Sequence, residues 1–146
     1  MYTASTISSS SLDATPRRRS ALQVVAIGAL AATVANVALW AGGRVADVGF
    51  RVSPPAGLPA FPVGVVLVVL TTLLTFAVGS AVLALAARRS RRWVRIVMAA
   101  AAVFAVVSAG GPLSAAHDTA TSALLATMHV VTGAAFVATA ARVRGR

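Results

Sequence analysis

The chain is 146 residues long; 58% of its residues are hydrophobic and only 11% are charged. A soluble domain carries about 25% charged residues, so this composition excludes an ordinary soluble domain and indicates that a lipid bilayer surrounds most of the chain. The net charge of +10 comes from thirteen Arg against three Asp. Because the arginines stand in short clusters between apolar runs, they are typical of membrane topology determinants and not of nucleic-acid binding.

Residues 1–19 are rich in Ser and Thr and include an arginine triplet at 17–19. They hold too few apolar residues to offset the entropy of ordering, which predicts a disordered cytoplasmic tail. Ala21–Ala41 then runs without a charge, and about 20 helical residues cross a bilayer core. A cleaved signal peptide is the alternative, but this apolar stretch exceeds the usual length of about 7–15 residues and no convincing cleavage site follows it.

The longest connection, 42–61, contains closely spaced prolines that rule out a regular helix and favour extended or turn structure. Its apolar residues Phe50, Leu58 and Phe61 are expected near the membrane interface. Pro62 suits the first turn of the helix that follows, where its missing N–H costs nothing.

Further apolar runs predict three more membrane-spanning helices. The expected helices cover about 21–41, 63–87, 94–113 and 120–141. The fold class is therefore an all-α membrane protein, an antiparallel bundle of four transmembrane helices within 20–142. Residues 143–146 form a basic cytoplasmic C-terminus. Short links after the second and third helices predict that each joins its neighbour in an antiparallel hairpin.

The arginines also predict the orientation. Eleven of them lie in the tail, at 88–95 and at the C-terminus, whereas only Arg44 and Arg51 lie on the other side of the predicted spans. Positively charged residues favour the cytoplasmic side. We therefore expect a multi-pass protein of the plasma membrane with cytoplasmic N- and C-termini, and with 42–61 and 114–119 outside.

Polar residues within the spans are the candidates for function. No Asp, Glu or Lys lies inside a predicted span, which argues against transport coupled to a carboxylate in mid-membrane. His129 is the one ionisable residue near mid-membrane. Counting residues from the helix ends places Thr75 at the same depth, and Asn36 and Ser108 about one turn further out. We predict that these four form an intramembrane polar layer.

His129 has several interpretations. The favoured one is a hydrogen-bonded pin between helices, because imidazole can both donate and accept. The alternatives are a proton or ligand site, or a side chain that faces a cavity or a partner chain. Nearby, Asp118 is expected to cap the last helix, and a metal site built on His117 and Asp118 is disfavoured because more ligands are needed.

Other chemistry has little support in the sequence. The chain has no Cys, which excludes disulfides and Cys-based metal sites. A dyad of Ser108 and His129 is conceivable, but apolar packing is the favoured interpretation. Small residues at four-residue spacing, such as Ala101, Ala105 and Ala109 or His129 and Gly133, favour close helix packing. We expect no catalytic residues, no metal and no cofactor.

Two short stretches resemble a known family. Residues 108–113 read Ser-Ala-Gly-Gly-Pro-Leu, and 124–131 read Leu-Leu-Ala-Thr-Met-His-Val-Val. The chain resembles, over about 20–142, a family of uncharacterised four-helix integral membrane proteins from high-GC Gram-positive bacteria, defined as a domain of unknown function. The resemblance implies four spans and a membrane location, and it supplies no activity.

Two functions are therefore carried forward. The first is a non-enzymatic accessory subunit or envelope component, whose partners are the lipid bilayer and either a second copy of the chain or another membrane protein. The second is a small transporter or sensor that uses the polar layer around His129. A membrane enzyme is the least favoured. A water-accessible cavity that reaches His129 would favour the second function, and a dry bundle the first.

Overall fold

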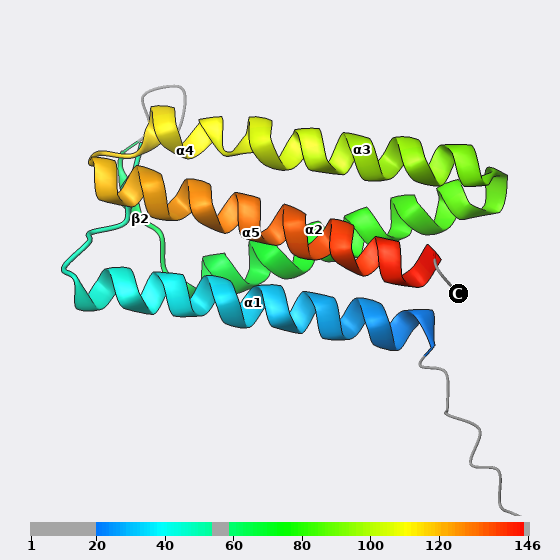
Figure 1. Cartoon of the computed structure of the whole chain (residues 1–146). Helices are drawn as coiled ribbons and strands as arrows, with labels where there is room; N and C mark the ends of the chain where they lie inside the picture. The colour runs from blue at the N-terminus through cyan, green and yellow to red at the C-terminus, as the bar shows by residue number, and fades with distance from the viewer. Residues whose placement is uncertain (1–19, 54–58, 145–146) are drawn as a thin grey trace, which may run out of the picture.

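The computed structural model of the chain describes residues 20–53 and 59–144, and in it four long helices lie antiparallel (Figure 1). The helices are α1 (Ala21–Val45), α2 (Val65–Arg89), α3 (Arg91–Ser108), its short continuation α4 (Gly110–Ala115), and α5 (Thr119–Arg144). This arrangement confirms the all-α, four-helix fold class. The predictions for the tail 1–19, for Leu58 and for the last two residues lie outside the described residues.

Within residues 20–53 and 59–144, four helical segments of 25 residues are long and apolar enough to cross a membrane. They are Ala21–Val45, Val65–Arg89, Arg91–Ala115 and Thr119–Val143. At a rise of about 1.5 Å per residue each spans roughly 37 Å, which exceeds the bilayer core of about 30 Å. Length and composition together indicate a membrane protein.

Local signals set the helix ends and extend most helices beyond the predicted bounds. Ser20 and Gln23 form a reciprocal capping box, in which the Gln23 N–H donates to the Ser20 hydroxyl oxygen and the Ser20 N–H to Gln23 Oε1. At the turn between α2 and α3, the hydroxyl oxygen of Ser90 accepts from the N–H of Trp93. This cap starts α3 at Arg91, three residues before the predicted start.

Pro112 divides the third span. An interior proline lacks the N–H that would bond to the carbonyl four residues earlier, which is that of Ser108. The helix is interrupted there, at Ala109, and resumes as α4 from Gly110 to Ala115. The predicted helix 94–113 is therefore two helical segments that together run from 91 to 115.

The connection between α1 and α2 contacts the connection between α4 and α5, at the end of the bundle opposite the α2–α3 turn. Strand β1 (Arg51–Val52) pairs antiparallel with β2 (Phe61–Pro62), and Val52 also forms a bridge to Ala116. The Ser53 hydroxyl lies 2.6 Å from His117 Nε2. Pro62 thus belongs to a strand and not to the first turn of α2, which begins only at Val65.

Phe50, the residue before β1, is buried in the protein. We expected it at the membrane interface, and this was wrong, because its side chain is only 1% exposed. It packs beside Trp40, with 6.3 Å between the ring centroids, and the Trp40 indole N–H donates to the carbonyl of Val63. Phe50 also adopts a positive φ of 49°, a conformation that costs about 1–3 kcal/mol and persists only where packing enforces it. Phe61 is exposed, and its place at the membrane interface stays a prediction.

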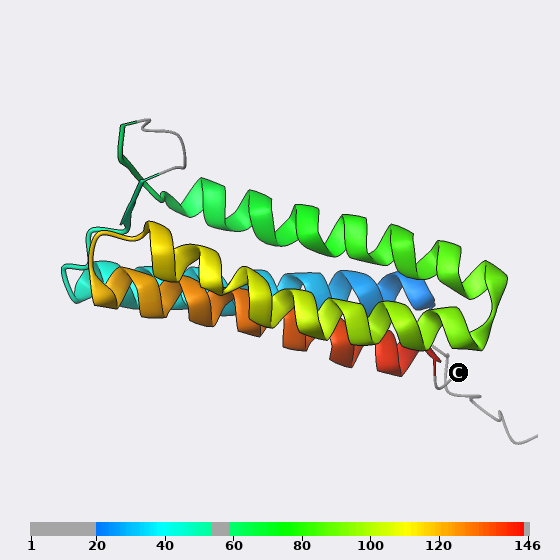
Figure 2. The same cartoon turned by 90° about the horizontal axis from the view of Figure 1, so that it is seen from above.

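The helices pack unevenly around α5. Helix α5 lies along both α1 and α3, α1 also packs on α2, and both predicted hairpins, α2 with α3 and α3 with α5, are present. Helix α2 makes little contact with α5, and Figure 2 shows these two helices along opposite sides of the bundle. The main core cluster includes Phe76 and Phe136, whose rings meet edge to face at 5.8 Å. A second cluster surrounds Phe50, Leu125 and Met128.

Candidate functional site

Asn36 of α1 joins three helices. Its side chain is 2% exposed, and its amide Nδ2 donates to Thr72 Oγ1 of α2 at 3.0 Å and to Thr132 Oγ1 of α5 at 2.8 Å. Both threonines are buried as well. Hydrogen bonds between membrane helices contribute about 0.6 kcal/mol each on average, so this pair stabilises the contact of α1 with both α2 and α5.

The direction of these bonds follows from the threonine hydroxyls. Thr72 Oγ1 donates to the carbonyl of Val68 and Thr132 Oγ1 to that of Met128, each at 2.8 Å. A hydroxyl has one hydrogen, so both hydroxyls can only accept from Asn36, and both amide hydrogens of Asn36 are used. The Asn36 Oδ1 atom is then left buried with no hydrogen-bond partner among the described residues.

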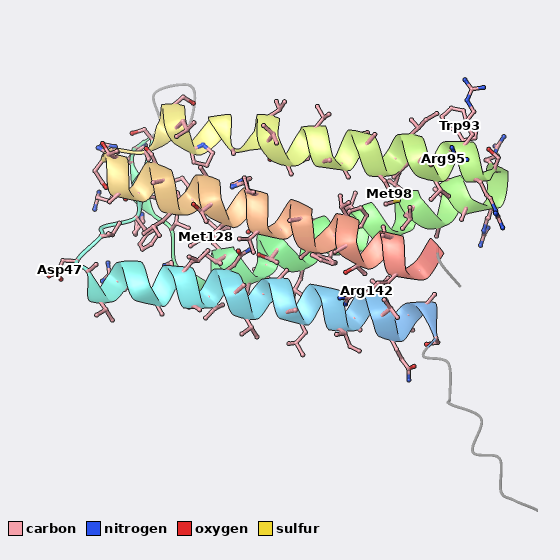
Figure 3. The ribbon with its side chains drawn as sticks, in the orientation of Figure 1. Asp47, Trp93, Arg95, Met98, Met128 and Arg142 are labelled. Atoms are coloured by element: carbon pink, nitrogen blue, oxygen red, sulfur yellow. The ribbon has the colours of Figure 1, made fainter. Side chains whose placement is uncertain are left out.

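A cleft of about 630 Å³ lies beside this group, between α2 and α3, with α5 behind it. Its walls are mostly apolar. The polar residues that line it are Asn36, Thr71, Thr72, Thr75, Ser108, His129 and Thr132. All four residues of the predicted polar layer thus line one cleft. Met128 lines the same cleft and lies between the two ends of the bundle (Figure 3), so part of the cleft lies between these ends.

Three of the four residues of the predicted layer, all except Asn36, make hydrogen bonds within their own helices. Thr75 Oγ1 donates to the carbonyl of Thr71 at 2.8 Å, and Ser108 Oγ to that of Ala105 at 3.2 Å. His129 Nδ1 lies 2.8 Å from the carbonyl of Leu125, in its own helix. In the described part of the chain, the bonds between helices come instead from Asn36 with its two threonines. The joint action of the four predicted residues stays a prediction.

The sequence analysis missed Thr72 and Thr132. Each lies three residues from a predicted member of the layer, Thr72 before Thr75 and Thr132 after His129, and so about one helical turn away. A buried Asn in an apolar span needs acceptors at its own depth. This requirement could have pointed to a threonine on each neighbouring helix. The choice between two polar residues one turn apart, however, depends on the rotation of each helix about its axis, which cannot be obtained by counting residues from the helix ends.

The bond to Leu125 also fixes the form of His129. A carbonyl oxygen only accepts, so Nδ1 carries the hydrogen, and in the neutral ring Nε2 is then an acceptor. The His129 side chain is exposed where it lines the cleft. Neither bond described for Ser108 or His129 joins the two side chains, so the conceivable dyad is not assembled in this geometry.

Asp118, at the start of α5, has a structural role. Asp118 Oδ1 accepts from the Thr121 N–H and Oδ2 from the Thr121 hydroxyl, each at 2.7 Å, which confirms the predicted cap. These two bonds, the backbone one first, hold the pKa of Asp118 below its ordinary value. Both oxygens of the Asp118 carboxylate are thus bonded to Thr121. Among the described residues, the Ser53–His117 contact therefore has no carboxylate hydrogen-bonded to the imidazole, as a Ser–His–Asp triad would require. Within 20–53 and 59–144, no group of three His, Cys, Asp or Glu residues could hold a metal ion.

Comparison with curated proteins and with solved structures finds no match. A family model, described as a family of unknown function, matches residues 16–146. The match covers nearly the whole chain, including both stretches on which the resemblance was based. The chain therefore belongs to the family of unknown function DUF6069.

Proposed function

We propose that this chain is a non-enzymatic, multi-pass component of the cell envelope that binds a small membrane-soluble molecule in the cleft between α2 and α3. The observation that carries the proposal is the cleft itself. Its volume of about 630 Å³ falls within the range of about 300–1,000 Å³ typical of small-molecule sites, and such sites are mostly apolar with a few polar groups.

The route of entry follows from the arrangement of the helices. Leu74 of α2 and Phe104 of α3 both line the cleft and are 64% and 67% exposed. Both lie within segments apolar enough to cross a membrane, so the surface beside them faces lipid tails and not water. A ligand that enters here comes from the bilayer.

The hydrogen bonding in the cleft supports binding over catalysis. An activated nucleophile needs a base within about 2.6–3.2 Å. The hydroxyls of Thr75 and Ser108 donate to backbone carbonyls of their own helices, and His129 uses Nδ1 in the same way.

A labelling experiment tests this function. The protein in lipid discs is exposed to a small apolar aryl-diazirine, irradiated, and the labelled residues are mapped by mass spectrometry. Thr75→Trp places a large ring in the cleft and is expected to remove label there, whereas Leu70→Trp, at a position exposed on α2 but outside the cleft, is expected to leave it. Cleft labelling equal in all three proteins, or none in the wild type, would contradict the proposal.

A second candidate function is a transporter or sensor that uses His129. The observation that favours it is the exposed imidazole on the cleft wall. If this ring controls the cleft, the labelling yield should differ between the wild type and His129→Gln. Equal yields in the two proteins would leave the first function as the better account.

Orientation and location are part of the same proposal. Arg95 and Arg142 lie toward one end of the bundle and Asp47 lies at the other (Figure 3). The excess of arginines at the first end supports cytoplasmic termini in the plasma membrane. A cytoplasmic-type reporter fused after Arg146 should be active, and insertions at Gly57 should report the outside; a cytoplasmic Gly57 would contradict the orientation.

The identity of the partners also belongs to the proposal. The lipid bilayer is the first, and a second copy of the chain or another membrane protein is the second. An origin in high-GC Gram-positive bacteria, implied by the resemblance, stays a prediction.

A further inference from the structure

We infer that the cleft selects neutral, apolar molecules whose polar head is a hydrogen-bond donor, namely long-chain or terpenoid alcohols, and that it rejects heads that only accept. This inference rests on the proposed function of the cleft. It is based on which hydrogen-bonding groups in the lining are already used and which are free.

Every hydroxyl in the lining uses its single hydrogen on its own helix. Each one donates to a backbone carbonyl three or four residues earlier. The donors and their distances are Thr71 to Leu67 at 2.7 Å, Thr72 to Val68 at 2.8 Å, Thr75 to Thr71 at 2.8 Å, Ser108 to Ala105 at 3.2 Å and Thr132 to Met128 at 2.8 Å. In an apolar environment, giving up such a bond is costly, so these hydrogens are not offered to a ligand.

The two nitrogen-bearing side chains are used in the same direction. Asn36 donates both amide hydrogens to Thr72 and Thr132, and His129 donates its Nδ1 hydrogen to Leu125. What is left free is Asn36 Oδ1, buried and without a partner, and His129 Nε2, on an exposed side chain. Both atoms are acceptors. Among the side chains that line the cleft, no free N–H or O–H donor is left.

An acceptor-only cleft discriminates among membrane molecules. A ketone, ester or ether head would leave its own oxygen unpaired in an apolar site and would leave His129 Nε2 unpaired as well. A carboxylate or phosphate would be less favourable still, because none of the described residues that line the cleft is an Arg. An ammonium group would find acceptors but no carboxylate to offset its loss of hydration.

A neutral hydroxyl meets none of these objections. It can donate to His129 Nε2, which lies on an exposed side chain, whereas Asn36 Oδ1 is fully buried and is not offered to a ligand. The chain attached to the hydroxyl then lies along the apolar walls formed by residues such as Leu67, Leu74 and Phe104. The chemical class that fits is therefore an apolar alcohol.

The test compares an alcohol with its methyl ether, which has the same chain but no donor. The protein in lipid discs is labelled with a hexadecanol that carries a diazirine in its chain. Unlabelled hexadecanol and hexadecyl methyl ether then compete, at matched mole fractions in the bilayer. One hydrogen bond contributes about 0.5–1.5 kcal/mol, so the alcohol is expected to compete roughly 2-fold to 13-fold better. His129→Phe, which leaves the Asn36 bonds intact, is expected to bring this ratio close to one.

The outcomes separate the inference from the proposed function. Equal competition by alcohol and ether, with labelling still confined to the cleft, would overturn donor selection and leave the binding function standing. A ratio that His129→Phe does not change would overturn the role of Nε2. If neither this probe nor the aryl-diazirine labels the cleft, binding fails and the inference fails with it.

Discussion

Replacing Asn36 by Leu is expected to change the free energy of unfolding by between about −0.2 and +1.8 kcal/mol, so that the protein is about as stable as wild type or more stable, although the change removes both interhelical hydrogen bonds. The bonds to Thr72 and Thr132 contribute about 0.6 kcal/mol each, which gives a loss of roughly 1.2 kcal/mol. The same change removes a buried Oδ1 that has no partner, and such an orphan costs about 1–3 kcal/mol. The stability gained by removing the unpaired Oδ1 therefore offsets the stability lost with the two hydrogen bonds.

Replacing Thr72 by Val should be the more damaging change. It removes one hydrogen bond and leaves an Asn36 N–H buried without an acceptor, so the expected loss is about 1–3 kcal/mol. In the background of Asn36→Leu that N–H no longer exists, and Thr72→Val should then cost close to zero. The two positions are thus predicted to be coupled by about 1–3 kcal/mol in a double-mutant cycle.

The assay is reversible unfolding in mixed micelles, titrated with SDS. Thr127→Val is the matched control, because Thr127 makes the same local bond, to the carbonyl of Ala123, but is exposed and bonds to no other helix. It should change the free energy of unfolding by less than about 0.5 kcal/mol. If Asn36→Leu costs more than 2 kcal/mol while Thr72→Val costs nothing, the assigned direction of the bonds is incorrect.

Two further changes probe packing and the cap of α5. A Cβ at Gly133 would collide with the Ala105 side chain, so Gly133→Ala should lower the free energy of unfolding by about 1–3 kcal/mol, whereas Gly42→Ala, with nothing within 4 Å, should be neutral or stabilising; equal effects would contradict the close contact. The pKa of Asp118 is lowered from 3.8 by its bonds to Thr121, so its carboxylate stabilises the fold above that value and the contribution is lost as pH falls further, through the folded pKa. Melting temperatures measured from pH 5 downward should therefore converge for wild type and Asp118→Asn, and a constant difference would contradict the shift.

The spans were predictable because their signal is strong and local. A run of about 20 apolar residues has few alternatives to a membrane helix, and four such runs gave the correct fold class. Helix ends were less predictable, since they depend on single contacts. Ser90 starts α3 early by capping Trp93, and Pro112 interrupts it by removing one donor.

The connection 42–61 was only partly predictable. Its prolines correctly excluded a helix, but the pairing of β1 with β2 depends on contacts between residues about ten apart in sequence, together with a bridge from Val52 to Ala116. The burial of Phe50 depends on the same tertiary arrangement. An aromatic residue in a loop beside a membrane span is equally consistent with the interface and with the core, and only the packing around Trp40 decides between them.

The candidate site was predicted to the level of depth and no further. Counting residues placed four polar side chains at similar heights, and all four line one cleft. The rotation of each helix about its axis decides which of them bond, and this rotation is set by the contacts of the whole bundle. Thr72 and not Thr75 faces Asn36 for that reason.

Two glycines set how closely the helices around the cleft approach one another. At Gly133 of α5, an added Cβ would collide with the Ala105 side chain of α3. One turn away on α5, the Phe136 ring packs against Gly79 of α2, where an added Cβ would lie 2.8 Å from the ring. All four residues line the cleft. A side chain at either glycine would therefore have to displace a wall of the cleft, because packed interiors have little free volume to accommodate it.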